Sequence, residues 1–247
     1  AQIAIENKYC KPTIYDGESY IESIELRHPI IEKINQKVPY VPNNISLGKN
    51  EDGILCYGTN ASGKSSLMKA VGLSVIMAQM GMYVPAKKFE FSPFKQLLTR
   101  ITDGDNLFKG QSTFVIEMLE LRTILKRANP FSLILGDEIC HGTEQTSGLA
   151  IVASSIEKMA KQKAKFIFAT HLHDLSKLEV VNSLDNVGHY HLKVHYRNSD
   201  DSLIYDRELE KGPGDAIYGL EVAKYVIQDN EFINQALELR RNIMGNK

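Results

Sequence analysis

Three short hydrophobic runs, at residues 54–57, 131–136 and 166–169, are separated by polar and glycine-containing segments. Runs of this length are typical of strands that are buried on both faces of a sheet. Segments 64–80 and 147–163 carry apolar residues at helical spacing, and Gly81 is placed to end the first of these helices. The order strand, helix, strand predicts parallel strands joined by a right-handed crossover.

The flanking segments predict further β structure and a final helix. Residues 13–57 alternate loosely and are interrupted by prolines, which favours a β-rich region. Residues 187–209 predict two antiparallel strands around a turn at 198–201, and the stretch from Asp229 predicts a helix. We therefore expect one α/β domain with a mostly parallel sheet flanked by helices and an antiparallel β edge or subdomain.

Composition excludes several classes of protein. The 247 residues include 29 Lys+Arg and 30 Asp+Glu, a balance that argues against coating nucleic acid by bulk attraction. No apolar run has the roughly 18 residues that a membrane span needs. Cys10, Cys56 and Cys140 lie far apart without a CxxC pair, so an intracellular protein without zinc or redox chemistry is expected. The first residues have no clear start of their own, which suggests a piece of a longer chain.

A glycine-rich motif lies between the first hydrophobic run and the first predicted helix. Its sequence GTNASGKS fits the P-loop pattern GxxxxGKS, in which backbone N–H groups and a helix N-terminus bind phosphate. Lys64 would bridge the β- and γ-phosphates, and the Ser65 hydroxyl would ligate Mg²⁺. The alternative is a chance glycine-rich turn, which the flanking strand and helix disfavour. The predicted nucleotide-binding residues are Gly58, Thr59, Asn60, Ala61, Ser62, Gly63, Lys64, Ser65 and Ser66.

Two carboxylates follow the second hydrophobic run. Because ligands of open α/β sheets bind at the carboxyl ends of strands, Asp137 is predicted to hold the Mg²⁺ shell. Glu138 is then placed to accept a proton from an attacking water molecule. The alternative makes Glu138 a surface charge.

Two further positions have weaker support. His171 ends the third hydrophobic run and could hydrogen-bond the γ-phosphate or the water, although a histidine after a strand is often structural. Ser112 and Thr113 open an apparent helix, where they could either form an anion site or act as a plain N-cap.

Taken together, these motifs resemble the ATPase domain of the MutS family of DNA mismatch-repair proteins, a branch of the ABC-class ATPases. The resemblance covers nearly the whole chain and includes segments that a generic P-loop does not explain. Besides the P-loop and the carboxylates, it rests on 27–29, 83–86, 99–101, 112–114, Glu117, Met118, Ile139, Gly142, Thr143, 168–171 and 218–220.

The resemblance implies an ATP-hydrolysing domain that uses ATP/ADP and Mg²⁺, with Lys64, Glu138 and His171 as its catalytic residues. It also implies composite sites in a dimer, each completed by Ser112 of a second MutS-type domain, and a homodimer is expected. Tyr40 would stack on adenine and Arg207 would make a second base contact. The implied boundaries are the end of a preceding lever or core region at 1–15, the ATPase domain at 16–228 and a C-terminal helix at 229–247. DNA would be bound by regions outside this chain, and no membrane is implied.

Two departures from the family pattern affect these expectations. The P-loop reads GTNASGKSS where bacterial relatives typically have GPNMGGKST, and His141 replaces the usual Arg before Gly142. Every phosphate contact named above is retained, so ATP hydrolysis is expected, and the resemblance implies that it switches a DNA clamp. The alternative is a catalytically weak, nucleotide-gated dimerisation module that acts in recombination rather than in mismatch repair.

Overall fold

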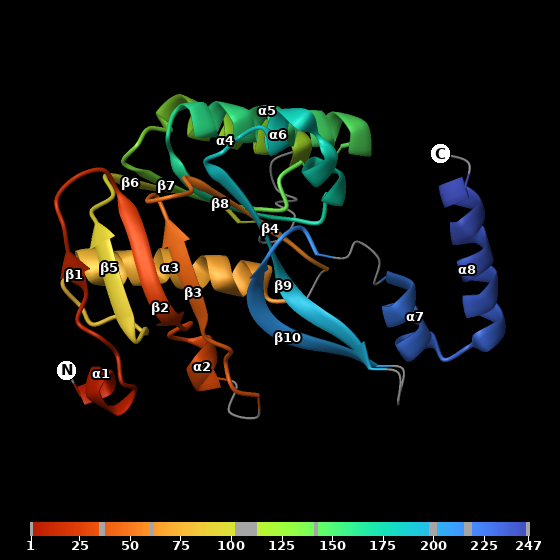
Figure 1. Ribbon diagram of the computed structural model, residues 1–247, viewed down its shortest axis with the longest axis horizontal. Helices are drawn as coiled ribbons and strands as arrows, with labels where there is room; N and C mark the ends of the chain where they lie inside the picture. The colour runs from red at the N-terminus through yellow and green to blue at the C-terminus, as the bar shows by residue number, and fades with distance from the viewer. Residues whose placement is uncertain are drawn as a thin grey trace.

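The hydrophobic runs form the centre of a six-stranded sheet in the computed structural model (Figure 1). Five strands are parallel, and β10 pairs antiparallel with β9 at one edge, which confirms the predicted sheet. In spatial order the strands are β10 (Ser202–Lys211), β9 (Val187–Arg197), β4 (Gly53–Tyr57), β8 (Lys165–Thr170), β7 (Ser132–Asp137) and β6 (Gln96–Arg100). The structure describes residues 2–34, 38–59, 62–101, 113–140, 143–197, 202–214 and 219–245.

Helices cover both faces of this sheet. The predicted helix 64–80 is α3 (Lys64–Gln79), and the predicted helix 147–163 is α5 (Gln145–Lys161). The face opposite α3 is covered by α5 with α4 (Thr113–Arg127), α6 (Glu179–Asn182) and the 3₁₀-helix His173–Lys177 (Figure 1). Buried side chains alternate between the two faces along β4, β7 and β8, which explains why each of these strands is apolar at successive positions.

A second sheet accounts for the β-rich N-terminal region. Its strand order is β1-β5-β2-β3, and only the pair β1 and β5 is parallel. The strands are β1 (Thr13–Ile14), β5 (Lys88–Ser92), β2 (Tyr20–Leu26) and β3 (Asn43–Leu47), and the short helices α1 (Gln2–Glu6) and α2 (Ile31–Ile34) lie beside them. The β-rich prediction for 13–57 is confirmed, whereas β5 was not predicted.

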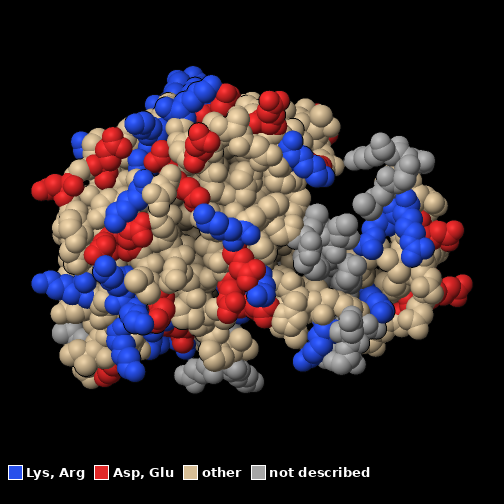
Figure 2. Space-filling model, viewed as in Figure 1, with Lys and Arg blue, Asp and Glu red and all other residues tan. Residues whose placement is uncertain are grey.

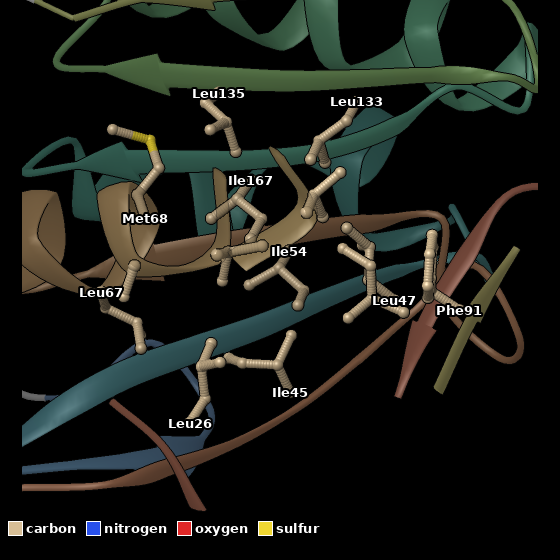
Figure 3. Packing of buried hydrophobic residues seen from close by; sticks show 14 of the residues in the cluster. Leu26, Ile45, Leu47, Ile54, Leu67, Met68, Phe91, Leu133, Leu135 and Ile167 are labelled. Atoms are coloured by element: carbon tan, nitrogen blue, oxygen red, sulfur yellow. The ribbon is translucent and has the colours of Figure 1, made fainter. Parts of the chain in front are cut away.

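Helix α3 is packed between the two sheets. Figure 3 shows Leu67 and Met68 of α3 directed into a cluster that contains Ile54 and Ile167 of the large sheet and Leu47 of the small one. These side chains are at most 3% exposed, and burial of each stabilises the fold by about 1.5–3 kcal/mol. The start of α3, where the glycine-rich motif lies, is therefore fixed relative to both sheets.

The C-terminal segment contains two helices, α7 (Gly219–Ile227) and α8 (Asn230–Gly245). α8 confirms the helix predicted from Asp229, and α7 was not predicted. Both lie beyond the β9–β10 hairpin, with the C-terminus far from the N-terminus (Figure 1). The turn predicted at 198–201 lies outside the described residues.

The surface carries charges of both signs, as the balanced composition predicts. Figure 2 shows Lys and Arg interspersed with Asp and Glu over most of the face in view. Within the described ranges, none of the helices combines the length and the apolar character that a bilayer span requires.

Candidate functional site

The glycine-rich motif connects β4, in the interior of the large sheet, to α3. Gly58 and Gly63 have φ angles of 148° and 109°, a region that residues with a Cβ atom rarely adopt. A Cβ atom at Gly58 would also lie 3.0 Å from Ser62 Oγ, which is tighter than ordinary van der Waals contact. The two glycines therefore let the chain turn back onto the N-terminus of α3. Asn60 and Ala61 lie outside the described residues.

Lys64 begins α3 and directs its ammonium group back into this loop. Its Nζ donates hydrogen bonds to the carbonyl oxygens of Gly58 at 2.7 Å and Thr59 at 2.8 Å. The residue is only 5% exposed. Burial lowers the pKa of Lys64, and the negative charges of Glu138 and Asp137 oppose that shift. The loop thus holds a buried cation within electrostatic reach of both predicted carboxylates.

Two buried hydroxyl groups beside Lys64 fit a polar ligand. Within the part of the chain that the structure describes, Thr59 Oγ1 and Ser62 Oγ are buried and have no hydrogen-bond partner. Buried side-chain polar groups in native proteins nearly always have one, so the loop has unused capacity to donate to phosphate oxygens. Ser65 and Ser66 lie partly exposed in the first turn of α3.

The two carboxylates lie at the carboxyl end of β7, which β8 separates from β4. Asp137 is the last residue of β7 and is 8% exposed. Glu138 follows with a φ angle of 47°, and its N–H donates to Ala169 O at 2.9 Å. A residue held in this left-handed region costs about 1–3 kcal/mol, so the surrounding structure must fix it.

His171 lies beside Glu138, as the order of the strands predicts. It follows β8, and its Nδ1 lies 3.9 Å from Glu138 Oε1. A pocket of about 670 Å³ opens next to His171, and its lining includes Cys140, His173 and Pro213. Burial lowers the pKa of His173, and the positive charge of Lys64 acts in the same direction. Both effects favour the neutral imidazole.

Tyr40 and Arg207 lie near the start of α3, although more than 160 residues separate them in the chain. Burial raises the pKa of Tyr40 to about 12, and the charge of Arg207 acts against that rise. A Cβ atom at Gly63 would lie 3.9 Å from Cγ and Cδ of Arg207. The structure thus places Arg207 against the glycine-rich loop and Tyr40 within electrostatic reach of Arg207.

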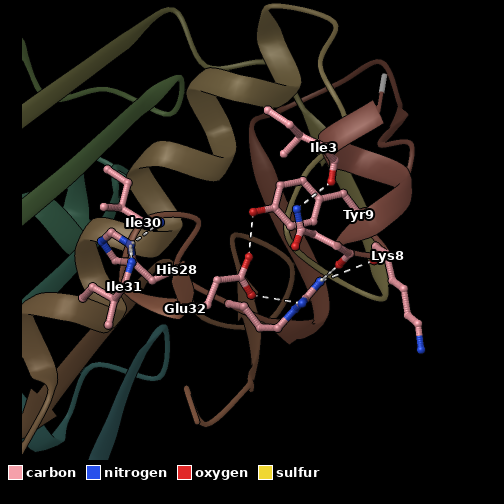
Figure 4. Close-up of polar contacts among 9 residues, drawn as sticks. Ile3, Lys8, Tyr9, His28, Ile30, Ile31 and Glu32 are labelled. Carbon is pink, nitrogen blue, oxygen red and sulfur yellow. Dashed lines mark hydrogen bonds and ion pairs between the residues drawn. The ribbon is translucent and has the colours of Figure 1, made fainter. Parts of the chain in front are cut away.

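Arg27 and His28, two of the motif positions near the start of the chain, make structural contacts in the region of Tyr40. His28 Nδ1 accepts hydrogen bonds from the N–H groups of Ile30 and Ile31, both at 3.2 Å (Figure 4). Its ring centroid lies 6.4 Å from that of Tyr40. Arg27 donates to Glu32 at 3.0 Å and also to the carbonyl oxygen of Asn7 at 3.0 Å. The contacts of Arg27 link α2 to the segment that follows α1.

Asn43 is a residue of this region that sequence reasoning missed. Arg207 has a φ angle of 61° and lies where the β9–β10 register shifts, between Tyr205 and Leu209. Asn43 Nδ2 donates to Arg207 O at 3.0 Å, and Asn43 Oδ1 accepts from Leu209 N at 2.7 Å. The amide therefore fills the hydrogen-bonding positions that the bulge leaves open. No local pattern links residues this far apart in the chain.

We expect Asn43→Ala to lower the free energy of unfolding by about 2 kcal/mol, because it leaves two backbone groups of the bulge unsatisfied. Urea denaturation measures the change. The matched control is Asn44→Ala, which removes one exposed hydrogen bond, from Glu25 N at 2.9 Å. Equal losses in the two variants would contradict this role of Asn43.

Several predicted positions lie outside the described residues. These are Ser112, His141, Gly142 and Tyr218, besides Asn60 and Ala61. Their predicted roles stay predictions. The helix expected after Ser112 is α4, which begins at Thr113.

Comparison with known proteins gives a consistent family match. The model of MutS domain V matches residues 54–244. A mitochondrial DNA mismatch repair protein mutS homologue of Sarcophyton glaucum is 44% identical over 97% of this chain and 24% of its own length. A mutS homologue of Acanthamoeba polyphaga mimivirus is 39% identical over 98% of this chain and 25% of its own length.

A bacterial relative supports the same family match. DNA mismatch repair protein MutS of Prochlorococcus marinus is 39% identical over 100% of this chain and 27% of its own length. The chain therefore spans about a quarter of the length of the relatives that it matches.

Proposed function

The chain belongs to the MutS family of DNA mismatch repair proteins, of which it contains domain V, and on this premise we propose that it binds and hydrolyses ATP. The observation that carries the proposal is the position of Lys64. Its ammonium group is buried in a glycine-rich loop, at the same sheet edge as the carboxylates of Asp137 and Glu138. Phosphate chemistry needs this combination of a fixed cation, backbone amides and acidic groups.

The loop would bind the phosphates through groups that are already oriented. Lys64 would exchange its hydrogen bonds to the carbonyl oxygens of Gly58 and Thr59 for charge-assisted bonds to phosphate oxygens. The N-terminus of α3 would add its positive dipole, which contributes about 0.3–1 kcal/mol for an exposed anion and more for a partly buried one. The hydroxyls of Thr59 and Ser62 would gain hydrogen-bond partners.

Ser65 and Asp137 supply the hard oxygen donors that magnesium prefers, and we propose that they hold it. The bound ion would neutralise charge on the phosphates. Asp137 is 8% exposed at the end of β7, so its carboxylate is suited to a fixed position rather than to a flexible surface role.

Glu138 would take the proton of the attacking water. The hydrogen bond from its N–H to Ala169 O and the left-handed backbone conformation fix where its side chain leaves β7. His171, whose Nδ1 lies 3.9 Å from the Glu138 carboxylate, would orient the water or the γ-phosphate. Adenine would stack on Tyr40, with Arg207 as its second contact.

We further propose that the site is completed by Ser112 of a second domain of this kind, in a homodimer. Binding and hydrolysis would then change the contact between two subunits and switch a clamp on DNA. Because the chain spans about a quarter of its relatives, we assign DNA recognition to regions outside it.

Mixing two inactive variants tests the composite site. We expect the intact protein with Lys64→Ala and the intact protein with Ser112→Ala each to be inactive in single-turnover ATP hydrolysis. An equimolar mixture should regain roughly a quarter of the wild-type rate, because half of randomly paired dimers combine the variants and each then has one complete site of two.

The control mixture pairs Lys64→Ala with a chain that carries both substitutions, and it should stay inactive. If the first mixture is no faster than its components, the two domains do not share a site. A nucleotide-gated module without catalysis would instead show ATP-dependent dimerisation and no turnover in the wild-type protein.

A further inference from the structure

Arg100 and Glu117 are motif positions to which the proposed function gives no role. Arg100 ends β6 and Glu117 lies in the second turn of α4, and the structure brings Arg100 Nη2 to 3.8 Å from Glu117 Oε1. The Glu117 side chain is only 4% exposed. A buried carboxylate is costly unless it is paired and hydrogen-bonded, so this position requires an explanation.

The explanation lies in the turn that follows Glu138. Glu117 Oε1 accepts a hydrogen bond from Cys140 N at 2.7 Å. Cys140 has a φ angle of 66°, so it is the second residue of this turn, after Glu138, in the left-handed region. The first is fixed by the hydrogen bond from Glu138 N to Ala169 O of β8, and the second is fixed by α4. The turn that carries Glu138 is thus held at both ends.

Arg100 fixes the carboxylate that makes this contact. It pairs in register with Gly136 of β7, directly before Asp137 and Glu138. Its Nε also lies 2.9 Å from Glu120 Oε2, on the same helix as Glu117. The guanidinium group therefore bridges β6 and α4 and neutralises the carboxylate that accepts the hydrogen bond from the backbone of the turn.

We propose that Glu117 is a positioning residue for Glu138, acting through the N–H of Cys140, and that Arg100 holds Glu117 in place. The proposal rests on the proposed function, in which Glu138 activates the water. In this proposal Glu117 acts on the turn through Cys140 N, so its loss should alter the rate of hydrolysis much more than the affinity for ATP.

Two substitutions of Glu117 separate the effect of its side-chain length from the effect of its charge. Glu117→Gln keeps an oxygen acceptor at the same distance and removes the charge, whereas Glu117→Asp keeps the charge and withdraws it from Cys140 by one methylene group. Glu117→Ala removes both. Glu120→Gln is the matched control, because Glu120, which also lies on α4, pairs with Arg100 but is about half exposed.

Amide hydrogen exchange in the intact, nucleotide-free protein tests the contact directly. We expect the Cys140 amide to exchange at least about 10-fold faster in Glu117→Ala and Glu117→Asp, and within about 3-fold of wild type in Glu117→Gln and Glu120→Gln. Amides of β4 should stay protected in every variant that folds. Unchanged exchange at Cys140 in Glu117→Asp would overturn the proposal, even if Glu117→Ala fails to fold.

Single-turnover hydrolysis tests the consequence. Glu117→Asp and Glu117→Ala should hydrolyse ATP about 10–100-fold more slowly with Kd for ATP changed less than about 3-fold, and Glu117→Gln should be near wild type. Equal rates in Glu117→Asp and wild type, or parallel losses of rate and affinity, would overturn the proposal. If the wild-type protein neither binds nor hydrolyses ATP, the proposed function fails instead, and the exchange data still decide the Glu117–Cys140 contact.

Discussion

Replacing Glu138 with Ala is expected to slow ATP hydrolysis by at least about 100-fold while the protein still binds ATP, because general-base catalysis typically contributes 10²–10⁴-fold. The carboxylate follows β7, and the hydrogen bonds of Lys64 go to the carbonyl oxygens of Gly58 and Thr59 instead, so the phosphate loop should keep its structure. Single-turnover hydrolysis gives the rate, and calorimetric titration of the same variant gives the affinity.

The isosteric variant Glu138→Gln controls for the lost volume and should be equally slow. His171→Asn should reduce the rate by a smaller factor, because His171 lies 3.9 Å from the carboxylate and would act on the water or the γ-phosphate from beside it. Hydrolysis at the wild-type rate in both Glu138 variants would remove this residue from the mechanism.

Replacing Lys64 with Met is expected to weaken ATP binding by at least about 100-fold. The substitution keeps the apolar stem that is packed in the loop and removes the ammonium group, and a hydrogen bond to a charged group contributes about 1.5–3 kcal/mol. Two such bonds to phosphate oxygens are lost together, so the expected decrease in binding free energy is about 3 kcal/mol or more.

Lys69→Met is the matched control for that variant. Lys69 lies in the second turn of the same helix. Burial and the charge of Lys69 lower the pKa of His28, so Lys69 lies within electrostatic reach of that residue. Its loss should leave the affinity for ATP within about 3-fold, as is usual for a charge that does not contact the ligand. Equal losses in the two variants would show that the effect of Lys64 is not local to the loop.

The sequence predicted the parts of the fold in which local pattern and burial agree. Strands β4, β7 and β8 are covered on both faces, so they appear as apolar runs, and α3 and α5 have their apolar residues at helical spacing. The glycine-rich loop, the carboxylates and His171 each follow one of these strands. Parallel strands have their carboxyl ends at one edge of the sheet, and this topology was enough to predict that these three groups lie together.

The remaining elements depend on contacts that no short window contains. β5 and β6 have five residues each, and their identity as strands comes from pairing with β2 and β7. Asn43 stabilises a bulge more than 160 residues away, and Glu117 bonds a backbone N–H in another element. In each case the side chain hydrogen-bonds a backbone group that only the tertiary fold brings close to it. A pattern of neighbouring residues in the sequence therefore does not reveal the contact.

The central claim is that the loop between β4 and α3 binds a nucleoside triphosphate, and calorimetric titration of ATP into the intact wild-type protein in the presence of magnesium tests it most directly. We predict saturable binding of one ATP per chain, weakened when magnesium is withheld and lost in Lys64→Met. A protein that takes up no ATP with magnesium present, or that binds it equally well without the ammonium group of Lys64, would contradict this account.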